Sequence, residues 1–451
     1  MKRKPVKACF MDSCMRIMPG KVSCNTFYMF FNANSEFSIE AFSKAFERFA
    51  EDMPIFTCRL SRGYFKDKWV PVEGYDSSKT IELFNISTAS EGDSVYDELF
   101  SNFSSLSNKH IDIEKEPPLK IKIFHDTNSG RNLLVMCVHH CLADGRGWLQ
   151  SLKLLGEYYD AALKGQTVRQ HKKNCRSISK FVFSVKPGDF LTTFKNLSKP
   201  SKIKEMKPVM ELGDYKNLRI DFDDLSIEKI VINKEQLADI KNSYKKYGFT
   251  INDILMHIVL KITDKFNMEL SDPNRYIGTG ILVDLRRYFK QEGLTIANYF
   301  ALESFEIDRT YIYDLEKFSE ELAAFKRRPL GLAFIVPILF TSLFPVRMLE
   351  NIIAGMMDGF NVQSYMGLAT TNFGKYDDYV AGFGSCIEGA AALPTSGVHG
   401  FPSVLVSGFK DVLTLCIVKY NDKEKLTKRI KDELVQMFDS LKAQGGKANE
   451  N

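Results

Sequence analysis

The stretch Leu133-Leu134-Val135-Met136-Cys137-Val138-His139-His140-Cys141-Leu142-Ala143-Asp144-Gly145 decides the fold of this 451-residue chain. Its first six residues form a continuous apolar run, which predicts a β-strand covered on both faces. Two adjacent histidines follow, and then a short loop that contains an Asp-Gly pair. We therefore expect a buried strand that ends at a pair of histidines beside a tight loop.

The residues on either side of this stretch predict the neighbours of the strand. Residues 119–125 alternate with a period of two, which indicates a strand with one buried face. The members of the predicted buried face are Leu119, Ile121, Ile123 and His125. Residues 128–130 are Asn-Ser-Gly and predict a turn. Apolar residues recur every three or four positions over 148–162, so a helix follows and ends near Gly165.

The two histidines cannot act together in a regular strand, because successive side chains point to opposite faces. An imidazole has an ordinary pKa of about 6.5, so near pH 7 it is largely neutral and therefore basic. His140 lies next to the loop and is the candidate general base for proton transfer. A structural histidine followed by an ordinary turn is the alternative interpretation.

Other chemistries for this segment have less support. The chain contains no GxSxG motif for a serine nucleophile. Cys141 would lie on the strand face opposite His140, so a cysteine–histidine pair is disfavoured. A metal site is not expected, because zinc needs convergent ligands and adjacent histidines diverge.

The rest of the chain predicts two halves joined by a linker. Residues 166–212 are dominated by Lys, Ser, Pro and Asn and form the candidate linker. It separates an N-terminal lobe, 1–165, from a C-terminal lobe, 213–451. Helices are predicted at 39–52, 237–244, 254–266 and 426–441, and further strands at 55–60, 69–72, 229–233, 276–283, 404–407 and 412–420.

The composition is that of an ordinary globular protein, with 44% hydrophobic and 26% charged residues. The net charge of +5 is not concentrated on one segment, so no nucleic-acid partner is expected. Nine cysteines without regular spacing indicate a reducing compartment rather than disulfides or zinc, although Cys9, Cys14 and Cys24 lie close together. Charged residues interrupt any N-terminal apolar stretch, so we expect no signal peptide and a cytoplasmic location.

One uncharged segment, 329–345, approaches the length of a membrane span. Proline stands at both of its ends and at position 337, which disfavours one straight helix. We expect no transmembrane segment and interpret the stretch as buried or substrate-facing. A weak contact with a membrane surface is the alternative.

The segment 139–145 resembles the HHxxxDG motif of the superfamily that contains condensation domains, alcohol acyltransferases and chloramphenicol acetyltransferase. Further segments resemble the family's patterns in the same order. They are Pro118-Leu119, Thr250-Ile251-Asn252-Asp253-Ile254-Leu255, Val283-Asp284-Leu285-Arg286, Ala297-Asn298-Tyr299-Phe300 and Thr371-Asn372-Phe373-Gly374. The resemblance spans most of the chain. It departs from the family at Ala297, where Gly is usual, and at Thr371, where Ser is usual.

The resemblance implies an α/β (two-layer α+β) fold, in which two chloramphenicol-acetyltransferase-like lobes form a pseudo-dimer around a central tunnel. It also implies that His140 is the catalytic base and that His139 is structural. Asp144 is then expected to pair with Arg286 and hold the loop, and Gly145 to let a thioester arm approach the backbone. The residues expected to line or brace the tunnel are Asn298, Thr371 and Asn372.

The implied activity is transfer of an acyl group from a thioester to the hydroxyl of a small-molecule acceptor, without a covalent acyl-enzyme. No permanently bound cofactor is expected. The co-substrate is acyl-CoA or, as a second choice, a phosphopantetheinyl thioester on an acyl or peptidyl carrier protein. Two alternatives stay open: a stand-alone condensation enzyme that forms an amide, and a non-catalytic relative that docks a carrier protein.

Overall fold

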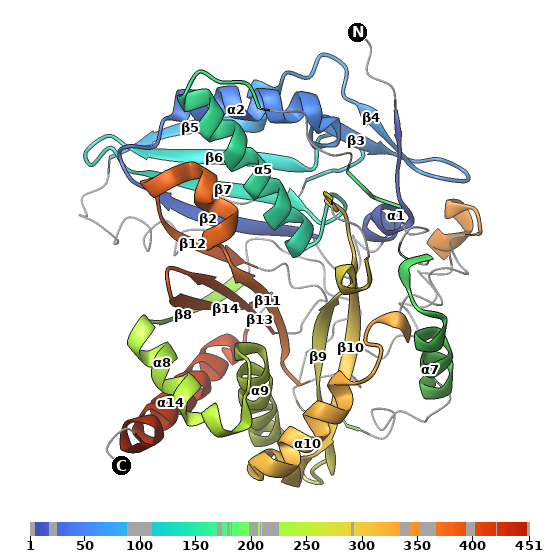
Figure 1. Ribbon diagram of the computed structural model, residues 1–451, viewed down its shortest axis with the longest axis vertical. Helices are drawn as coiled ribbons and strands as arrows, with labels where there is room; N and C mark the ends of the chain where they lie inside the picture. The colour runs from blue at the N-terminus through green and yellow to red at the C-terminus, as the bar shows by residue number, and fades with distance from the viewer. Residues whose placement is uncertain are drawn as a thin grey trace.

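The computed structural model describes residues 5–17, 25–87, 111–168, 174–177, 181, 183–197, 206–207, 209, 225–289, 293–333, 343–351, 367–393, 402–420 and 422–448. They form a mixed α/β fold, as predicted, and its strands are arranged in three sheets. Two lobes lie one above the other in Figure 1, the first built mainly on residues from the N-terminal half and the second mainly on residues from the C-terminal half. The predicted linker, 166–212, is described only in part, at residues 166–168, 174–177, 181, 183–197, 206–207 and 209, and it contains the helix α7.

The first lobe is built on a five-stranded sheet. Its strands, in order, are β12 (Ile387–Leu393), β2 (Thr26–Ala33), β7 (Asn132–His139), β6 (Leu119–Asp126) and β5 (Ile81–Ile86). All neighbours are antiparallel except β5 and β6, which are parallel. Helices α2 (Ile39–Asp52) and α5 (Gly145–Leu163) cover one face of this sheet (Figure 1) and share a core with it.

Strand β7 is buried on both faces, as its apolar run predicts. Its even-numbered residues from 134 to 138 join the core beneath α2 and α5. Its odd-numbered residues from 133 to 137 join a second cluster, which also contains Cys416 and Val418 of the second lobe. The strand that ends at the histidines therefore lies between the helices of the first lobe and the sheet of the second.

The second lobe is built on a six-stranded sheet. Its strands, in order, are β10 (Phe300–Asp308), β9 (Tyr276–Asp284), β11 (Ala369–Lys375), β13 (Ser403–Phe409), β14 (Val412–Tyr420) and β8 (Leu225–Ile232). β11 runs parallel to both of its neighbours, and the other pairs are antiparallel. Its helices are α8 (Lys234–Ser243), α9 (Ile251–Asn267), α10 (Leu315–Lys326) and α14 (Leu426–Ala448).

Smaller elements complete the described chain. A three-stranded sheet contains β1 (Val6–Lys7), β4 (Lys68–Pro71) and β3 (Cys58–Ser61). The short helices are α1 (Phe10–Ile17), α7 (Pro187–Leu197) and α13 (Asp377–Val380). The 3-10 helices are η1 (Pro54–Thr57), η2 (Ser77–Thr80), η4 (Lys245–Tyr247), η5 (Leu285–Tyr288), η6 (Arg309–Tyr313) and η8 (Ala381–Cys386).

Two local predictions are wrong. Residues 55–57 belong to η1 rather than to a strand, because Pro54 occupies the first turn of a 3-10 helix. In β6 the predicted alternation fails at its end, where Phe124 is buried and His125 is partly exposed. Phe124 stacks on Phe84 of β5 with 5.1 Å between ring centroids, so the parallel neighbour provides the apolar contact that the alternation did not anticipate.

The apolar segment 329–345 is described only at its two ends, because residues 334–342 lie outside the described ranges. Leu330 and Leu332 are buried, as expected, whereas Leu343 and Phe344 are exposed. None of the helices in the described ranges combines the length and apolar character that crossing a membrane requires.

The late part of the chain returns to the first lobe. β12 pairs with β2 in the first sheet, although it belongs to the range predicted as the C-terminal lobe. Just before it, Gly382 of η8 packs directly on Gly156 of α5. A Cβ on Gly382 would stand 2.4 Å from the carbonyl carbon of Gly156 and 2.8 Å from the nitrogen of Glu157. Neither backbone group can give way alone, so this contact needs glycine.

We predict that Gly382→Ala lowers the free energy of unfolding by about 1–3 kcal/mol, because the added methyl group forces η8 away from α5. Urea unfolding followed by circular dichroism measures the change. Gly188→Ala in α7 is the matched control, because a Cβ there meets nothing within 4 Å. Equal stability of the two variants would contradict the close packing of η8 on α5.

Candidate active site

His140 follows the last residue of β7 and lies where the two lobes meet. Its ring contacts Phe27 of β2 edge-on, with 5.5 Å between centroids, and the ring of Phe300 at the start of β10, with 5.4 Å. The residue is partly exposed, in contrast to the fully buried strand that precedes it. The imidazole therefore lies in an aromatic surrounding without being sealed inside it.

The side chain of Asn298 determines which nitrogen of His140 carries the proton. Asn298 Nδ2 donates to the backbone oxygen of His140 at 2.8 Å and lies 3.4 Å from that of Cys141. Carbonyl oxygens only accept, so the amide nitrogen must face them. Asn298 Oδ1 then faces His140 Nδ1 at 3.0 Å and can only accept. Nδ1 is therefore protonated in the neutral ring, and Nε2 carries the lone pair.

The surroundings of His140 favour its neutral form. Burial lowers the pKa of His140 below its ordinary value of 6.5, and this effect exceeds the opposite influence of the Asp144 charge and of the Asn298 hydrogen bond. An aromatic environment solvates an imidazolium poorly, whereas the neutral ring keeps its one hydrogen bond to an amide. The ring is therefore in its basic form at neutral pH.

His139 lies on the other side of the strand and is buried, with 1% of its surface exposed. Its Nδ1 accepts the backbone N–H of Cys141 at 3.2 Å, and its own backbone N–H donates to Pro118 at 2.8 Å. These contacts fix the turn after β7, which is the structural role that the sequence resemblance implies.

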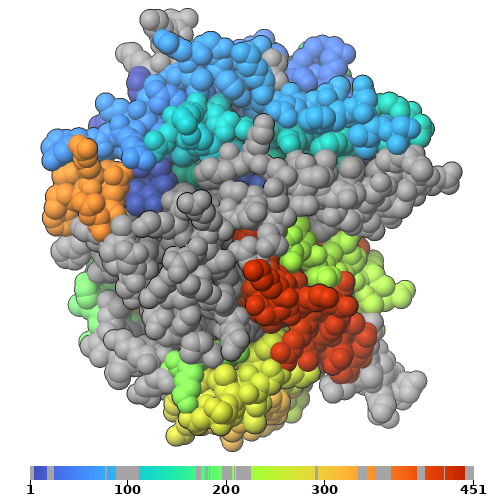
Figure 2. All heavy atoms as spheres, turned by 180° about the vertical axis from the view of Figure 1, so that it is seen from behind, coloured from blue at the N-terminus to red at the C-terminus, as the bar shows by residue number. Residues whose placement is uncertain are grey.

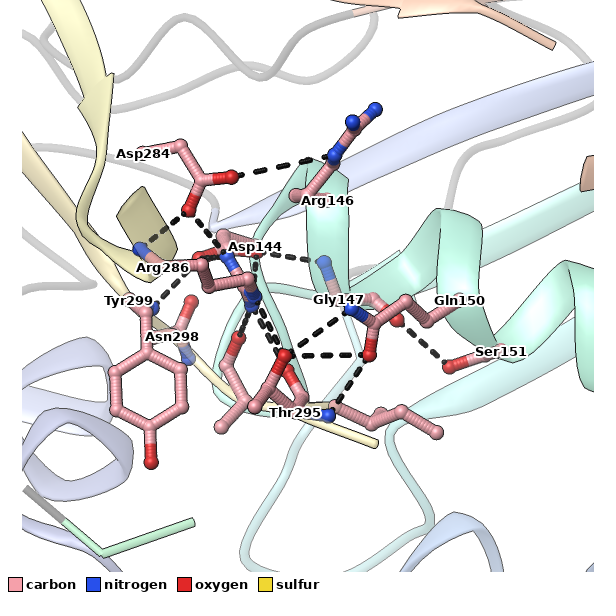
Figure 3. Close-up of polar contacts among 12 residues, drawn as sticks. Asp144, Arg146, Gly147, Gln150, Ser151, Asp284, Arg286, Thr295, Asn298 and Tyr299 are labelled. Atoms are coloured by element: carbon pink, nitrogen blue, oxygen red, sulfur yellow. Dashed lines mark hydrogen bonds and ion pairs between the residues drawn. The ribbon is translucent and has the colours of Figure 1, made fainter. Parts of the chain in front are cut away.

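Asp144 is placed by the start of helix α5. It is the N-cap of this helix, and its Oδ1 accepts the backbone N–H of Gly147 at 2.7 Å. Its Oδ2 accepts the backbone N–H of Tyr299 at 2.6 Å, from the segment that precedes β10. Figure 3 shows the carboxylate between these two segments, facing Arg286. It thus connects a helix of the first lobe to a strand of the second.

Arg286 comes from η5, directly after β9, and binds Asp144 through two nitrogens. Nη2 lies 2.9 Å from Oδ1 and Nη1 lies 3.0 Å from Oδ2, the forked geometry in which guanidinium and carboxylate fit best. The same guanidinium donates to the side chain of Asp284 and to backbone oxygens of Thr295 and Ala297, each at 2.9–3.0 Å (Figure 3). Burial is the largest single influence on the pKa of Arg286 and lowers it, but the charges and hydrogen bonds of Asp144 and Asp284 together outweigh burial, so the pKa is raised.

Residues 174–177 also brace the site, although the sequence analysis assigned them to a linker. Asn174 exchanges two hydrogen bonds with the backbone of Ile296, at 2.8 and 3.1 Å. Arg176 Nη1 donates to the backbone oxygen of Leu142 at 2.8 Å and also to that of Ile296, and its Nη2 reaches the buried Asp12 of α1 at 2.7 Å. No periodic signal in the sequence marks Arg176, because its partners are backbone oxygens from distant segments.

Gly145 faces the ring of Phe373 in β11. A Cβ on Gly145 would stand 2.8 Å from this ring, which also lies 5.9 Å from that of Phe27. Phe373 is the extra residue of a β-bulge between Asn372 and Gly374, and the φ of 82° at Gly374 completes the irregular turn of the strand. The bulge thus directs an aromatic side chain onto the motif loop beside His140.

The two other tunnel candidates in β11 have different surroundings. Asn372 is exposed, its Nδ2 donates to Asn252 in the first turn of α9, and its Oδ1 accepts the backbone N–H of Gly374 at 2.7 Å. This side chain braces β11 against α9. Thr371 is partly exposed and pairs with Leu405 of β13. A role for either residue in lining a tunnel stays a prediction.

Within the part of the chain that the structure describes, no group of three or more His, Cys, Asp or Glu side chains could hold a metal ion. Cys24, one of the three clustered cysteines, lies outside that part.

Comparisons with known proteins bear on this arrangement. Residues 15–177, which include the motif at 139–145, match the family model described as Condensation domain. No curated protein matches the sequence of the chain. Among solved structures, the chain is similar to the first condensation domain of the calcium-dependent antibiotic synthetase in complex with a substrate analogue. The two are 11% identical, over 98% of this chain and 97% of that one, with a TM-score of 0.67.

Two further solved structures are similar over most of their length. One is the TRI3 trichothecene 15-O-acetyltransferase from Fusarium sporotrichioides, 11% identical over 97% of this chain and 95% of that one, with a TM-score of 0.65. The other is the epimerization domain from the third module of tyrocidine synthetase B, 11% identical over 98% and 99%, with a TM-score of 0.64. Similarity at this identity shows the fold, so the predicted fold is confirmed. The central tunnel stays a prediction.

We predict that Asp144→Ala lowers the free energy of unfolding by about 3–5 kcal/mol, because it leaves the buried guanidinium of Arg286 without its carboxylate. Thermal or urea unfolding measures the loss. Asp284→Ala is the matched control, since Asp284 contacts the same guanidinium at 3.0 Å but has 42% of its side chain exposed. The control is expected to change stability by about 1 kcal/mol or less. Normal stability of Asp144→Ala would contradict the importance of the pair.

Proposed function

The chain has the fold of the condensation-domain superfamily, and its residues 15–177 match the Condensation domain family; from this premise we propose that it transfers an acyl group from a thioester to the hydroxyl of a small-molecule acceptor. His140 is the general base. The observation that carries the proposal is the Asn298 hydrogen bond, which leaves the lone pair of a partly exposed, neutral imidazole on Nε2.

The proposed reaction is a direct transfer. The acceptor hydroxyl gives its proton to His140 Nε2 while its oxygen attacks the thioester carbonyl carbon. The tetrahedral intermediate then collapses, the carbon–sulfur bond breaks, and the leaving thiolate takes the proton back from the imidazolium. Holding donor and acceptor together at one base supplies much of the rate enhancement. No covalent acyl-enzyme is required, so the buried Cys141 is not part of the mechanism.

The residues around His140 have positioning roles in this proposal. Asn298 fixes the tautomer and the orientation of the ring. The Asp144–Arg286 pair holds the segment 295–299, from which Asn298 comes, against the motif loop. Gly145 gives the space that Phe373 occupies, so this aromatic ring can lie beside the reacting groups.

The donor is proposed to be acyl-CoA, with a carrier-bound phosphopantetheinyl thioester as the second choice. Formation of an amide from a carrier-bound donor uses the same base, and the similarity to synthetase condensation domains supports it as the alternative. TRI3 is an O-acetyltransferase, and the similarity of its structure supports a hydroxyl acceptor on this fold. A non-catalytic relative that docks a carrier protein is the remaining alternative.

We predict that thiol release from a panel of acyl-CoAs, in the presence of small alcohols or amines, falls about 100- to 10,000-fold in His140→Ala. A thiol-reactive dye measures the release, and the pairing of acyl group and acceptor that supports turnover distinguishes ester from amide formation. His125→Ala is the control histidine, because His125 is bonded to Asn132 of the neighbouring strand, far along β6 from the motif. Full activity of His140→Ala would remove this residue from the mechanism, and binding without turnover would favour the docking alternative.

The lowered pKa of His140 predicts the pH dependence of the reaction. The base acts only when neutral, so the rate falls as the pH drops through the pKa that His140 has in the folded enzyme. Because burial holds that pKa below 6.5, we expect the acid limb of the kcat/KM profile to be centred below pH 6.5. A pH–rate profile with folding checked at each pH tests this. An acid limb centred above 6.5 would contradict the lowered pKa of His140.

A further inference from the structure

Large apolar side chains gather on one edge of the molecule, which we call the apolar edge. Two of them lie in the loop between β3 and β4, and three lie in the segment 343–351. They are Tyr64, Phe65, Leu343, Phe344 and Met348, with exposed fractions of 59%, 68%, 80%, 46% and 48%. Figure 1 draws the two segments at the same side of the molecule, and Figure 2 shows the orange segment against the blue residues of the first lobe from behind.

The two segments of the apolar edge are hydrogen-bonded to each other, and the segment 343–351 is anchored to the buried part of the protein. The backbone N–H groups of Val346 and Arg347 donate to the backbone oxygens of Phe65 and Tyr64, at 3.3 and 3.4 Å. The segment 343–351 is anchored by Leu349, which is 1% exposed, and by Glu350, which accepts a hydrogen bond from the buried Arg16 at 2.8 Å. The exposed side chains are therefore presented by a packed support and not by two independent loops.

Exposed basic residues lie in or next to the same two segments as these apolar side chains. They are Arg62 and Lys66 in the loop, Lys68 at the start of β4, and Arg347 in the segment 343–351. Arg62 pairs with Glu114 at 2.6 Å. Asp67 is fully buried against Arg16, and Glu350, whose side chain is 30% exposed, binds the same arginine. Among the described residues of the apolar edge, basic side chains therefore outnumber the exposed carboxylates.

We propose that the apolar edge docks on an anionic phospholipid bilayer. Exposed apolar patches of this kind mark interaction sites, and aromatic and aliphatic side chains enter the headgroup boundary of a membrane. Lys and Arg beside them contact anionic headgroups while their stems follow the apolar surface. The positive charge of the edge favours an anionic bilayer over a second copy of the chain as the binding partner. A symmetric dimer through this edge would bring the same cations face to face.

Co-sedimentation of the full chain with vesicles, without substrate, tests the proposal and is independent of acyl transfer. We expect binding to vesicles of equal phosphatidylcholine and phosphatidylserine, weak binding to phosphatidylcholine alone, and loss of binding as salt rises. Each Lys or Arg near the anionic surface strengthens partitioning about fivefold. Lys66, Lys68 and Arg347 form no ion pair with the residues that the structure describes. Their combined reversal, as Lys66→Glu, Lys68→Glu and Arg347→Glu, is expected to weaken binding at least about tenfold. Its matched control reverses three exposed lysines elsewhere, namely Lys241, Lys245 and Lys423.

A second pair of variants tests the contribution of the apolar side chains to vesicle binding separately from that of the cations. Phe65→Ser with Leu343→Ser removes two inserted side chains and is expected to weaken binding to the mixed vesicles. Leu163→Ser with Met268→Ser is the control, because these residues are 53% and 51% exposed at other places. Circular dichroism checks that each variant is folded. Three results would overturn the proposal: no binding of the native chain to mixed vesicles, binding that survives both edge variants, or a dimer that the edge variants convert to a monomer in the absence of vesicle binding.

Discussion

The buried ion pair of Asp144 and Arg286 is the constraint on which the geometry of the site depends. One carboxylate caps α5, accepts the backbone N–H of Tyr299 and receives two guanidinium nitrogens. It therefore joins the first helix after the motif to the strand pair β9–β10 of the second lobe. Because Asn298 precedes Tyr299 directly, holding the backbone of Tyr299 also holds the amide that orients His140.

Such a pair is retained at an energetic cost. Removing two charges from water costs free energy. The attraction between the charges offsets this desolvation cost only when the remaining hydrogen-bonding positions of both groups are also satisfied. In this protein they are: Arg286 donates to backbone oxygens of Thr295 and Ala297, and its Nε reaches the hydroxyl of Thr295 at 2.9 Å. Gln150 of α5 binds the same hydroxyl and the backbone N–H of Thr295. The charged pair thus extends into a polar network that spans both lobes.

Sequence reasoning predicts those parts of the fold that depend on local pattern. The doubly buried β7, the amphipathic α2 and the helix after the motif follow from periodicity, and their bounds agree with the structure. It does not predict β12, whose place beside β2 depends on a pairing between segments more than 350 residues apart. The turn at η1 was also missed, because a single proline outweighed the β-forming residues after it.

For the site, the motif identified His140 and Asp144, and the resemblance supplied Arg286 and Asn298. The sequence pattern did not indicate that Arg176 and Phe373 contact the site. Arg176 binds backbone oxygens, and because every residue has one, the residue types in the sequence do not indicate this contact. Phe373 is placed by a bulge, and a bulge shifts a side chain relative to its strand without changing the composition of that strand. Tertiary pairing alone determines both positions.

The different contacts of Asp144 and Asn298 explain how the imidazole of His140 stays neutral. A carboxylate bonded to His140 would stabilise the imidazolium and raise its pKa, and the Asp144 charge does act in that direction. Arg286 holds this carboxylate, and a neutral amide contacts the ring in its place. Asn298 therefore fixes the ring and its tautomer without stabilising the protonated form. Orientation and basicity are set by different residues, so burial can keep the lone pair of Nε2 available.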